Sequence, residues 1–380
     1  MTDDTMINGA MTGTAGRRRL DRTLDEYFVR NSSTAAAKAA AQDKRAVAAL
    51  KRCATQNPVL GFVIVIVIAI SFIAISICLL SVPASAQTQN LTRAQTRQQL
   101  LQDLESGQLQ DAVLLGQRAV SRWPLDAQFR HYLGVAYFKT GDTKQAQEQL
   151  TRAQELNPAD SAAHFDLALV LLSHQDDAGA ATELEAAIKL NSSNANPNAL
   201  AHELLGRAYL NSNRSLPAVD EFKIALKLDP AIKHGHYNLG FAYFSLGRND
   251  EAISEYKEEL RRSGESPAVV YELGRSLVAS GKYEAAVTYL QRGTELDAPN
   301  PEVWYNLGKA QALAGQAAQA ESSLRKAAEL NPKDPSPHYQ LARVLERLGR
   351  GEEARSELAR FAELKKAQPA SAGMATGRDQ

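Results

Sequence analysis

The sequence of 380 residues predicts an all-α protein, a solenoid of about eight stacked helix–turn–helix repeats preceded by one apolar helix. Three observations predict this fold class. A cassette beginning Leu-Gly or Leu-Ala returns about every 34 residues, apolar residues in each copy form two helical stripes, and a long uncharged run precedes the first copy. A fixed period of this length is typical of stacked repeats, in which each unit buries its apolar face against its neighbours.

Residues 1–58 form a polar segment rich in small side chains, with three consecutive arginines at 17–19. Leu20, Leu24 and Tyr27 lie at helical spacing, so a short amphipathic helix over 20–30 is one interpretation and a disordered tail is the other. The segment holds six acidic residues. Mitochondrial presequences are normally poor in acidic residues, so the composition argues against one.

Residues 59–82 contain 24 residues without a charge, and about 20 apolar residues suffice to cross a bilayer. Lys-Arg pairs precede this run at 44–45 and 51–52, and the next charge after it is Arg93. Positive charge marks the cytoplasmic side of a membrane segment. We therefore expect a single-pass membrane protein with a cytoplasmic N-terminus and with the repeats on the extracytoplasmic (periplasmic) side.

The connector 83–92 begins with Pro83-Ala84-Ser85-Ala86, which resembles a signal-peptidase site. One alternative is a retained anchor; the other is a signal peptide cleaved near Ala86, which would release a secreted protein. The length of the apolar run and the 58 residues before it favour the anchor. The cleavage motif, together with a start codon further downstream, would favour release.

A 34-residue frame holds register from residue 93 to 368, and the tail 369–380 is predicted to be disordered. Alanine stands at position 20 in all eight copies, leucine at position 7 in seven, and glycine at position 15 in six. The eight predicted repeats are 93–126, 127–160, 161–194, 199–232, 233–266, 267–300, 301–334 and 335–368.

Each position in the frame has a structural role. Apolar residues at positions 4, 7, 8 and 11 form the stripe of a first helix, and those at 20, 24 and 27 form the stripe of a second. Glycine or asparagine at position 15 suits the end of a helix before a tight turn. Small residues at positions 8 and 20 allow the two helices to approach closely, and proline near position 32 ends the second helix.

Four regions depart from this frame. The first repeat is degenerate, as expected of a terminal unit with one face in solvent. A turn-rich insert from Asn191 to Asn198 lengthens the loop after the third repeat. Glu259 replaces the expected alanine and is followed by two arginines and Ser263-Gly264, which predicts that this helix ends early. The charged last helix of the eighth repeat is predicted to be a polar C-terminal cap.

Two repeats show the recurring pattern most fully. The fourth repeat contains Leu205, Gly206, Tyr209, Ala218, Phe222, Ala225 and Pro230. The seventh contains Trp304, Leu307, Gly308, Ala320, Ala327 and Pro332, with Gln311 at the position of the tyrosine. By this pattern the chain resembles the tetratricopeptide-repeat family over about three quarters of its length. This resemblance implies a right-handed α-α superhelix whose concave groove is lined by first-helix positions near 2, 5, 6, 9, 12 and 13.

Charge and composition exclude several classes of function. Lys and Arg total 43 against 43 Asp and Glu; ten and six of these lie in residues 1–58, which leaves 33 against 37 in the rest. A mildly acidic solenoid is a poor candidate for binding nucleic acid, which needs a basic stripe. Both cysteines, Cys53 and Cys78, precede the repeats, so helix packing rather than a disulfide must stabilise them.

The sequence holds no catalytic motif: no phosphate-binding loop, no nucleophile elbow and no His-Glu-x-x-His. We therefore predict no enzymatic activity, no cofactor, no metal and no small-molecule substrate. Four of the seven histidines, His164, His202, His236 and His338, recur at position 4 of the frame, where repetition favours a role in packing.

First-helix positions 5 and 9 carry aromatic and basic side chains in the C-terminal half of the array, and they are neighbours on one helical face. Tyrosine beside arginine or lysine suits an extended, acidic peptide, whereas tyrosine packed between first helices is the structural alternative. Position 5 has no lysine and position 9 no asparagine, so the chaperone-tail clamp of the family is not matched. The groove candidates are Phe138, Phe165, Arg207, Tyr237, Asn238, Phe241, Phe244, Tyr271, Arg275, Tyr305, Asn306, Lys309, Tyr339 and Arg343.

The sequence thus predicts a protein- or peptide-binding scaffold that holds extended polypeptide segments in its groove. Two alternatives stay open: a membrane-tethered assembly subunit of an envelope or secretion complex that uses its outer surface, and a soluble exported form released by cleavage.

Overall fold

The computed structural model describes residues 91–191 and 198–367, and the chain divides into two compact units, 1–197 and 198–380. The predictions for 1–58, for 59–82, for most of the connector, for the insert after Asn191 and for the tail lie outside the described residues. Within the described ranges, no helix combines the length and the apolar character needed to cross a membrane.

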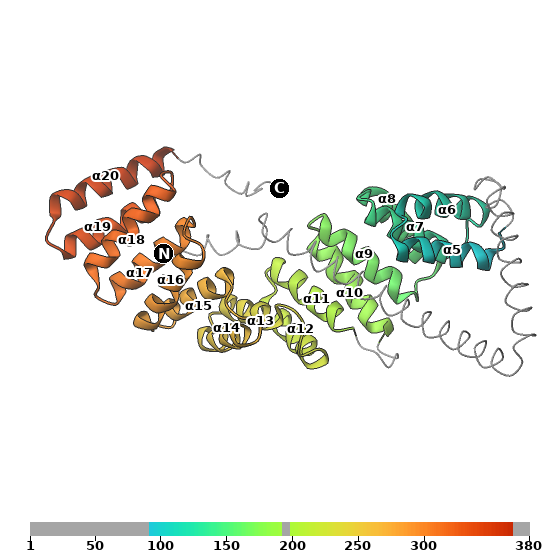
Figure 1. Cartoon of the computed structure of the whole chain (residues 1–380), viewed down its shortest axis with the longest axis horizontal. Helices are drawn as coiled ribbons and strands as arrows, with labels where there is room; N and C mark the ends of the chain where they lie inside the picture. The colour runs from blue at the N-terminus through green and yellow to red at the C-terminus, as the bar shows by residue number, and fades with distance from the viewer. Residues whose placement is uncertain (1–90, 192–197, 368–380) are drawn as a thin grey trace, which may run out of the picture. The chain divides into compact units, whose positions relative to one another are not determined.

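The described part of the first unit contains six helices, and consecutive helices pack against each other (Figure 1). Each second helix returns beside the first helix of its own pair, so the unit is a row of helical hairpins. The helices are α5 (Arg93–Ser106), α6 (Leu109–Arg122), α7 (Ala127–Lys139), α8 (Thr143–Leu156), α9 (Ser161–Ser173) and α10 (Asp177–Asn191).

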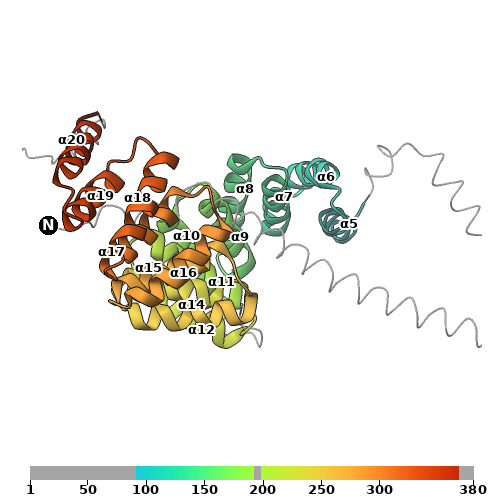
Figure 2. The same ribbon diagram turned by 60° about the vertical axis from the view of Figure 1, so that its left-hand side comes forward.

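The described part of the second unit contains ten helices with the same alternation, which Figures 1 and 2 show from two sides. No strand occurs in the described residues, so the predicted all-α solenoid of helix pairs is confirmed. The helices are α11 (Ala199–Asn211), α12 (Ser215–Leu228), α13 (Gly235–Ser245), α14 (Asn249–Ser263), α15 (Pro267–Ala279), α16 (Tyr283–Leu296), α17 (Pro301–Leu313), α18 (Ala317–Leu330), α19 (Ser336–Arg347) and α20 (Gly351–Ala367).

The turn inside every helix pair has one residue in the left-handed backbone region. The six predicted glycines at frame position 15 adopt φ values from 71° to 87°. The two other repeats place Gln175 (φ 63°) and Asn213 (φ 59°) at the same point. Left-handed backbone favours glycine and, less strongly, asparagine. The glutamine is therefore the least suitable residue in this series of turns.

The core between paired helices follows the predicted frame. All eight alanines of position 20 are 0% or 1% exposed. Small first-helix residues receive the large side chains of position 24: a Cβ atom added at Gly240 would lie 2.9 Å from the Tyr256 ring, and one at Gly206 would lie 2.7 Å from Phe222. Close approach of the backbones therefore depends on the missing side chain.

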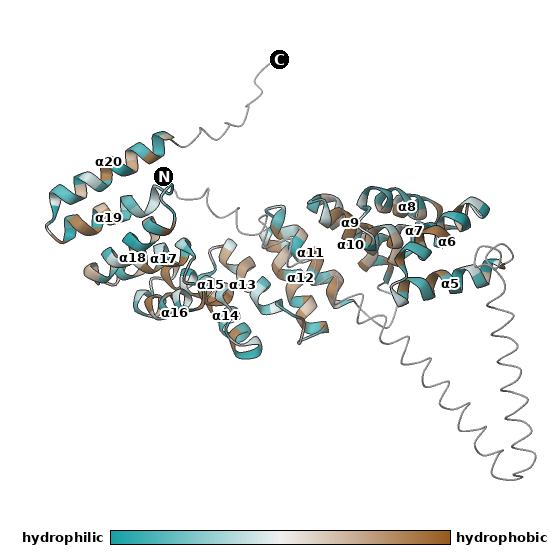
Figure 3. Ribbon diagram, turned by 45° about the horizontal axis from the view of Figure 1, so that its top comes forward, coloured by the Kyte–Doolittle hydropathy of each residue, from teal (hydrophilic) through white to brown (hydrophobic). Residues whose placement is uncertain are grey.

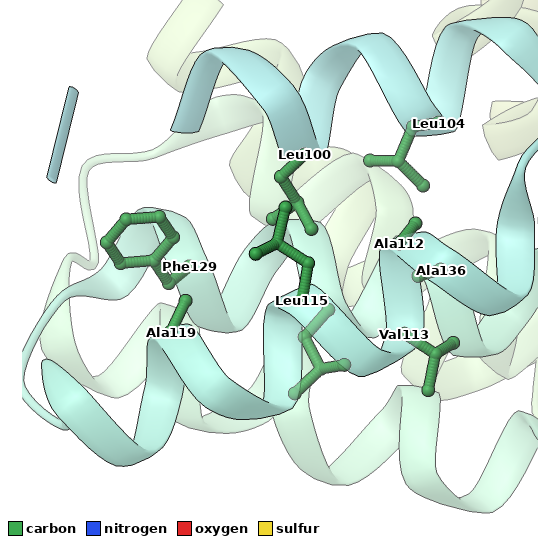
Figure 4. Close-up of a cluster of buried hydrophobic side chains, with 9 residues drawn as sticks. Leu100, Leu104, Ala112, Val113, Leu115, Ala119, Phe129 and Ala136 are labelled. Carbon is green, nitrogen blue, oxygen red and sulfur yellow. The ribbon is translucent and has the colours of Figure 1, made fainter. Parts of the chain in front are cut away.

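The degenerate first repeat still builds a core with its neighbour (Figure 4). Leu100 and Leu104 of α5 face Leu115 of α6, and Phe129 of α7 closes the cluster. The Trp123 ring stacks on Phe129 with centroids 5.1 Å apart. Apolar residues at the helical spacing thus compensate for the absent Leu-Gly pair.

The expectation that the second helix of repeat five ends early is wrong. Helix α14 continues to Ser263, so it is as long as α10 and longer than α12. Glu259 is 3% exposed, and its carboxylate accepts hydrogen bonds from the backbone N–H of Tyr237 (3.3 Å) and from the Ser263 hydroxyl (3.0 Å). Helix α13 has no side-chain cap of its own at His234. The carboxylate of α14 therefore caps α13, which explains why a charged residue is accepted there.

The last helix is largely polar in Figure 3, and Ala354 is its one buried residue. Acidic residues stand in its first turn and Lys365 and Lys366 in its last turn, which suits the helix dipole.

Candidate functional site

The predicted groove residues lie on first helices of both units, and the structure separates them by accessibility. Phe138 and Phe165 belong to α7 and α9 of the first unit, and the rest lie on α11, α13, α15, α17 and α19 of the second. Phe165, Tyr237, Asn238 and Phe241 are buried. Side chains that are covered in this way hold neighbouring helices together and offer little surface to a ligand.

Polar contacts join position 5 of one repeat to position 6 of the next. The Asn238 amide donates to Glu203 Oε1 (2.8 Å), and the Asn306 amide donates to the Tyr271 hydroxyl oxygen (3.1 Å). In the first unit, His131 Nε2 lies 2.6 Å from Asp166 Oδ2. Each pair is 35 residues apart. Asn238 and Asn306, predicted to bond a peptide, each donate a hydrogen bond to the preceding repeat.

Arg275 is held in place by its own neighbours. Its guanidinium lies over the rings of Phe244 (5.0 Å) and Tyr271 (5.5 Å) and forms an ion pair with buried Glu272 (3.0 Å). Burial by itself lowers the pKa of Arg275, but the charge and hydrogen bond of the Glu272 carboxylate outweigh it, and the pKa is raised. The cation is therefore strongly held in an ion pair inside the unit.

Tyr271 is similarly engaged. Its hydroxyl donates to Glu302 Oε2 (3.1 Å) while it accepts from Asn306. Burial is the main cause that raises the pKa of Tyr271, so the phenol stays protonated. Arg207 is half-buried near Glu203, with Nη1 3.8 Å from its carboxylate. Tyr271 therefore connects α15 to α17, whereas the contact of Arg207 lies within α11.

The accessible members of the set gather on α17 and α19. Tyr305 and Lys309 of α17 are half-buried, whereas Tyr339 (42% exposed) and Arg343 of α19 are exposed. The Arg343 guanidinium lies 6.0 Å from the centre of the Tyr339 ring. Phe138 and Phe244 are half-buried on their own helices. The predicted alternation of tyrosine and cation is thus available to solvent at the C-terminal end of the second unit.

The four histidines of position 4 form an internal series that sequence reasoning identified as structural without finding their partners. In each case Nδ1 lies 2.6 or 2.7 Å from a glutamate Oε2 located 19 residues further on, at position 23 of the same repeat. A search for acidic residues at this offset would have found them. The pairs are His164–Glu183, His202–Glu221, His236–Glu255 and His338–Glu357.

None of the described residues forms a group of three His, Cys, Asp or Glu side chains placed to hold a metal ion. The arrangement is suited instead to contact with another polypeptide, because the exposed side chains are aromatic and basic and lie on neighbouring helices.

Comparisons with known proteins follow the same division of the chain. A family model described as the C-terminal domain of cilia and flagella-associated protein 70 matches residues 199–363. A tetratricopeptide-repeat model matches residues 101–144 and 133–195. No curated protein gives a significant match.

Several solved structures are similar. MamA from Desulfovibrio magneticus RS-1 is 19% identical, with a TM-score of 0.44, over 45% of this chain and 97% of that one. YrrB, described as a TPR protein with an unusual peptide-binding site, is 23% identical, with a TM-score of 0.42, over 47% of this chain and 92% of its own. Cut9–Hcn1 is 17% identical, with a TM-score of 0.45, over 68% of this chain and 50% of that chain. The repeated helix pairs and the two family models together show that the chain is a member of the tetratricopeptide-repeat family.

Proposed function

We propose that this protein is a non-enzymatic scaffold that binds extended polypeptide segments along the first helices of its second unit. The observation that carries the proposal is the accessible pair of tyrosine and cation on α17 and again on α19, namely Tyr305 with Lys309 and Tyr339 with Arg343. Tyrosine offers rigid contact area, and the cations pair with carboxylates of a ligand. One short segment would bind with a dissociation constant of about 1 μM, because its contacts are few and its ordering costs entropy.

The test uses the full chain and a random dodecapeptide library immobilised on beads. Peptides selected by the wild-type protein should bind the double variant Tyr305→Ala/Tyr339→Ala about tenfold more weakly. Tyr283→Ala, which removes a half-buried tyrosine from the start of α16, serves as the control and should leave binding unchanged. Equal affinity for all three proteins would contradict the proposed groove.

We further propose that the repeats are displayed on the extracytoplasmic side of a membrane and that residues 59–82 are the anchor. The uncharged run and the basic residues before it support this arrangement. N-terminal sequencing of the mature protein is the test: a sequence beginning near Gln87 would contradict the anchor and favour the released form.

The outer surface supports a second candidate function, an assembly subunit of a membrane complex. Leu216, Ile224 and Leu228 are exposed at multiples of four residues along α12, so they lie on one face of that helix. Loss of partner binding in Ile224→Asp, with Tyr339→Ala unaffected, would favour this function over the groove.

A further inference from the structure

A shallow hollow lies between α17 and α19, beside the accessible tyrosines. It has a volume of about 60 Å³, and its lining includes Lys309, Leu313, Arg343, Val344 and Arg347. Pockets for whole small-molecule ligands typically measure about 300–1,000 Å³. The hollow is therefore a subsite that accepts one small group of a larger ligand.

The cations of this hollow differ from those around them. Within the described residues, neither Lys309 nor Arg343 has a carboxylate partner, and Arg347 donates to the Ala312 carbonyl (2.8 Å). Each of the other arginines between residues 267 and 367 contacts a carboxylate of its own unit. They are Arg275, Arg292, Arg325, Arg350, Arg355 and Arg360.

Three of the described residues that line the hollow are thus cations, and none of the lining residues in this part of the chain is acidic. Arg343 and Arg347 are one turn apart on α19, and Lys309 faces them from α17, so an anion between the helices would be bound from both sides. Guanidinium and ammonium groups form their strongest hydrogen bonds with carboxylates and phosphates. The acidic balance of the chain after residue 58 argues against a nucleic-acid backbone as the source of the anion.

Apart from Gln340, the rest of the lining is apolar. Val344 is buried and Leu313 is 42% exposed at the edge of the hollow. A ligand that places a carboxylate against the cations would therefore place its adjacent atoms against aliphatic side chains. A peptide in which an apolar residue adjoins a carboxylate satisfies both halves of the site.

We infer that this hollow recognises a peptide carboxylate next to an apolar side chain and so determines which segments the scaffold binds. This inference rests on the proposed function of the groove and names the chemistry of its ligand. The carboxylate can come from an internal Asp or Glu or from the free C-terminus of a chain, and both sources present the same group.

The experiment compares the full-length wild type with the variant Lys309→Met/Arg343→Met. Two random dodecapeptide libraries are coupled to beads through their N-termini, one with amidated C-termini and one with free C-termini. Wild-type protein should enrich Asp or Glu beside Leu, Ile, Val or Phe in the amidated library, or should favour apolar final residues in the free library. The peptide set that is enriched identifies the source of the carboxylate.

Selected peptides should bind the variant about tenfold more weakly or worse, since charged hydrogen bonds are lost. The control variant Lys333→Met/Lys365→Met removes the same number of charges from exposed positions outside the hollow and should bind as the wild type. Circular dichroism and thermal unfolding verify that both variants are folded; if the double variant unfolds, the exposed single variant Arg343→Met takes its place.

The outcomes separate the two claims. Peptides that bind without enrichment of carboxylates, or that bind the variant as tightly as the wild type, would contradict carboxylate recognition by the hollow. The proposal that the groove binds peptides would still hold. If neither library yields a bound peptide, both the hollow and the groove are contradicted.

Discussion

The Nε2 atom of His131 on α7 lies 2.6 Å from Oδ2 of Asp166 on α9, so one polar contact joins two successive repeats of the first unit. Its Nδ1 atom lies 3.8 Å from Asp160, the residue that caps α9. The imidazole is buried between two carboxylates, and a charged imidazole would satisfy both. This contact between the two repeats therefore depends on pH.

We predict that the first unit becomes less stable as the pH rises from 6 to 9. Burial alone lowers the pKa of His131, but the hydrogen bond and charge of Asp166 and the charge of Asp160 outweigh it and raise the folded pKa above 6.5. Stability from a raised histidine pKa is fully present below the unfolded value and is lost as the pH passes the folded value. Hydrogen exchange of amides in α7 and α9 measures this change.

The variant His131→Gln should remove this pH dependence and should cost about 1–3 kcal/mol at pH 6, because Asp166 loses a buried partner. His174→Gln is the control, since His174 is exposed and contacts only the Thr143 hydroxyl among the described residues. An unchanged slope of stability against pH in His131→Gln would contradict the assignment.

Glu259→Gln should destabilise the second unit by about 1–3 kcal/mol, because the carboxylate of α14 caps α13. Burial alone raises the pKa of Glu259, but the nearby His234 imidazole (Nδ1 3.7 Å away) and the hydrogen bonds from Ser263 and the Tyr237 N–H outweigh it and lower the pKa. A lowered carboxyl pKa adds stability above about pH 4.5, and this stability is lost as the pH falls through the folded value.

Urea unfolding of the second unit at pH 7 and pH 4 measures both effects of Glu259. The neighbouring Glu258 is paired with Arg261 and Arg262 in solvent, so Glu258→Gln is the matched control and should leave the midpoint nearly unchanged. Equal midpoints for the two variants would show that Glu259 does not cap α13.

Gln175→Gly should stabilise the first unit by about 0.5–1 kcal/mol, because Gln175 holds a left-handed backbone (φ 63°) that glycine adopts without strain. Gly141→Ala changes the equivalent turn in the opposite direction (φ 87°) and should destabilise by about 1 kcal/mol. Thermal unfolding of both variants gives the comparison; a lower melting temperature for Gln175→Gly would contradict the argument.

Arg275→Met should reduce stability rather than ligand affinity. The substitution removes the ion pair with buried Glu272 and the contacts with Phe244 and Tyr271, at a cost of about 1–3 kcal/mol. Peptide binding by the folded fraction should stay within about twofold of the wild type. Loss of binding without loss of stability would instead place Arg275 in the ligand site.

Much of the fold could be predicted because the same residue types return at the same positions in eight repeats, so that each helix and turn is indicated several times. The frame positions of Ala218, Gly240 and Asn213 hold similar residues in most repeats. In the structure these positions serve, respectively, as a buried small residue, a point of close helix approach and a left-handed turn. The exception at Glu259 could not be predicted, since its stabilising partner, the N–H of Tyr237, belongs to the preceding helix and carries no sequence signal.

The sequence predicted which repeat positions line the groove, but not which of their side chains are accessible to a ligand. Tyr271 and Tyr339 share position 5, yet one is bonded to Glu302 and Asn306 while the other is 42% exposed. The difference arises from the next repeat, which supplies Asn306 opposite Tyr271. Searching the sequence for polar residues 35 positions apart would find some of these contacts. The exposure of each tyrosine depends on how neighbouring side chains pack, which the repeat period does not predict.

The most direct measurement places a photo-crosslinking amino acid at position 339 of the full chain and, in a separate protein, at position 257 on an exposed part of α14. Each protein is irradiated with biotinylated peptides selected from the libraries. We predict strong crosslinking from position 339 that unlabelled peptide abolishes, and none above background from position 257. Equal crosslinking from both positions, or none from position 339, would contradict a peptide-binding groove on the first helices.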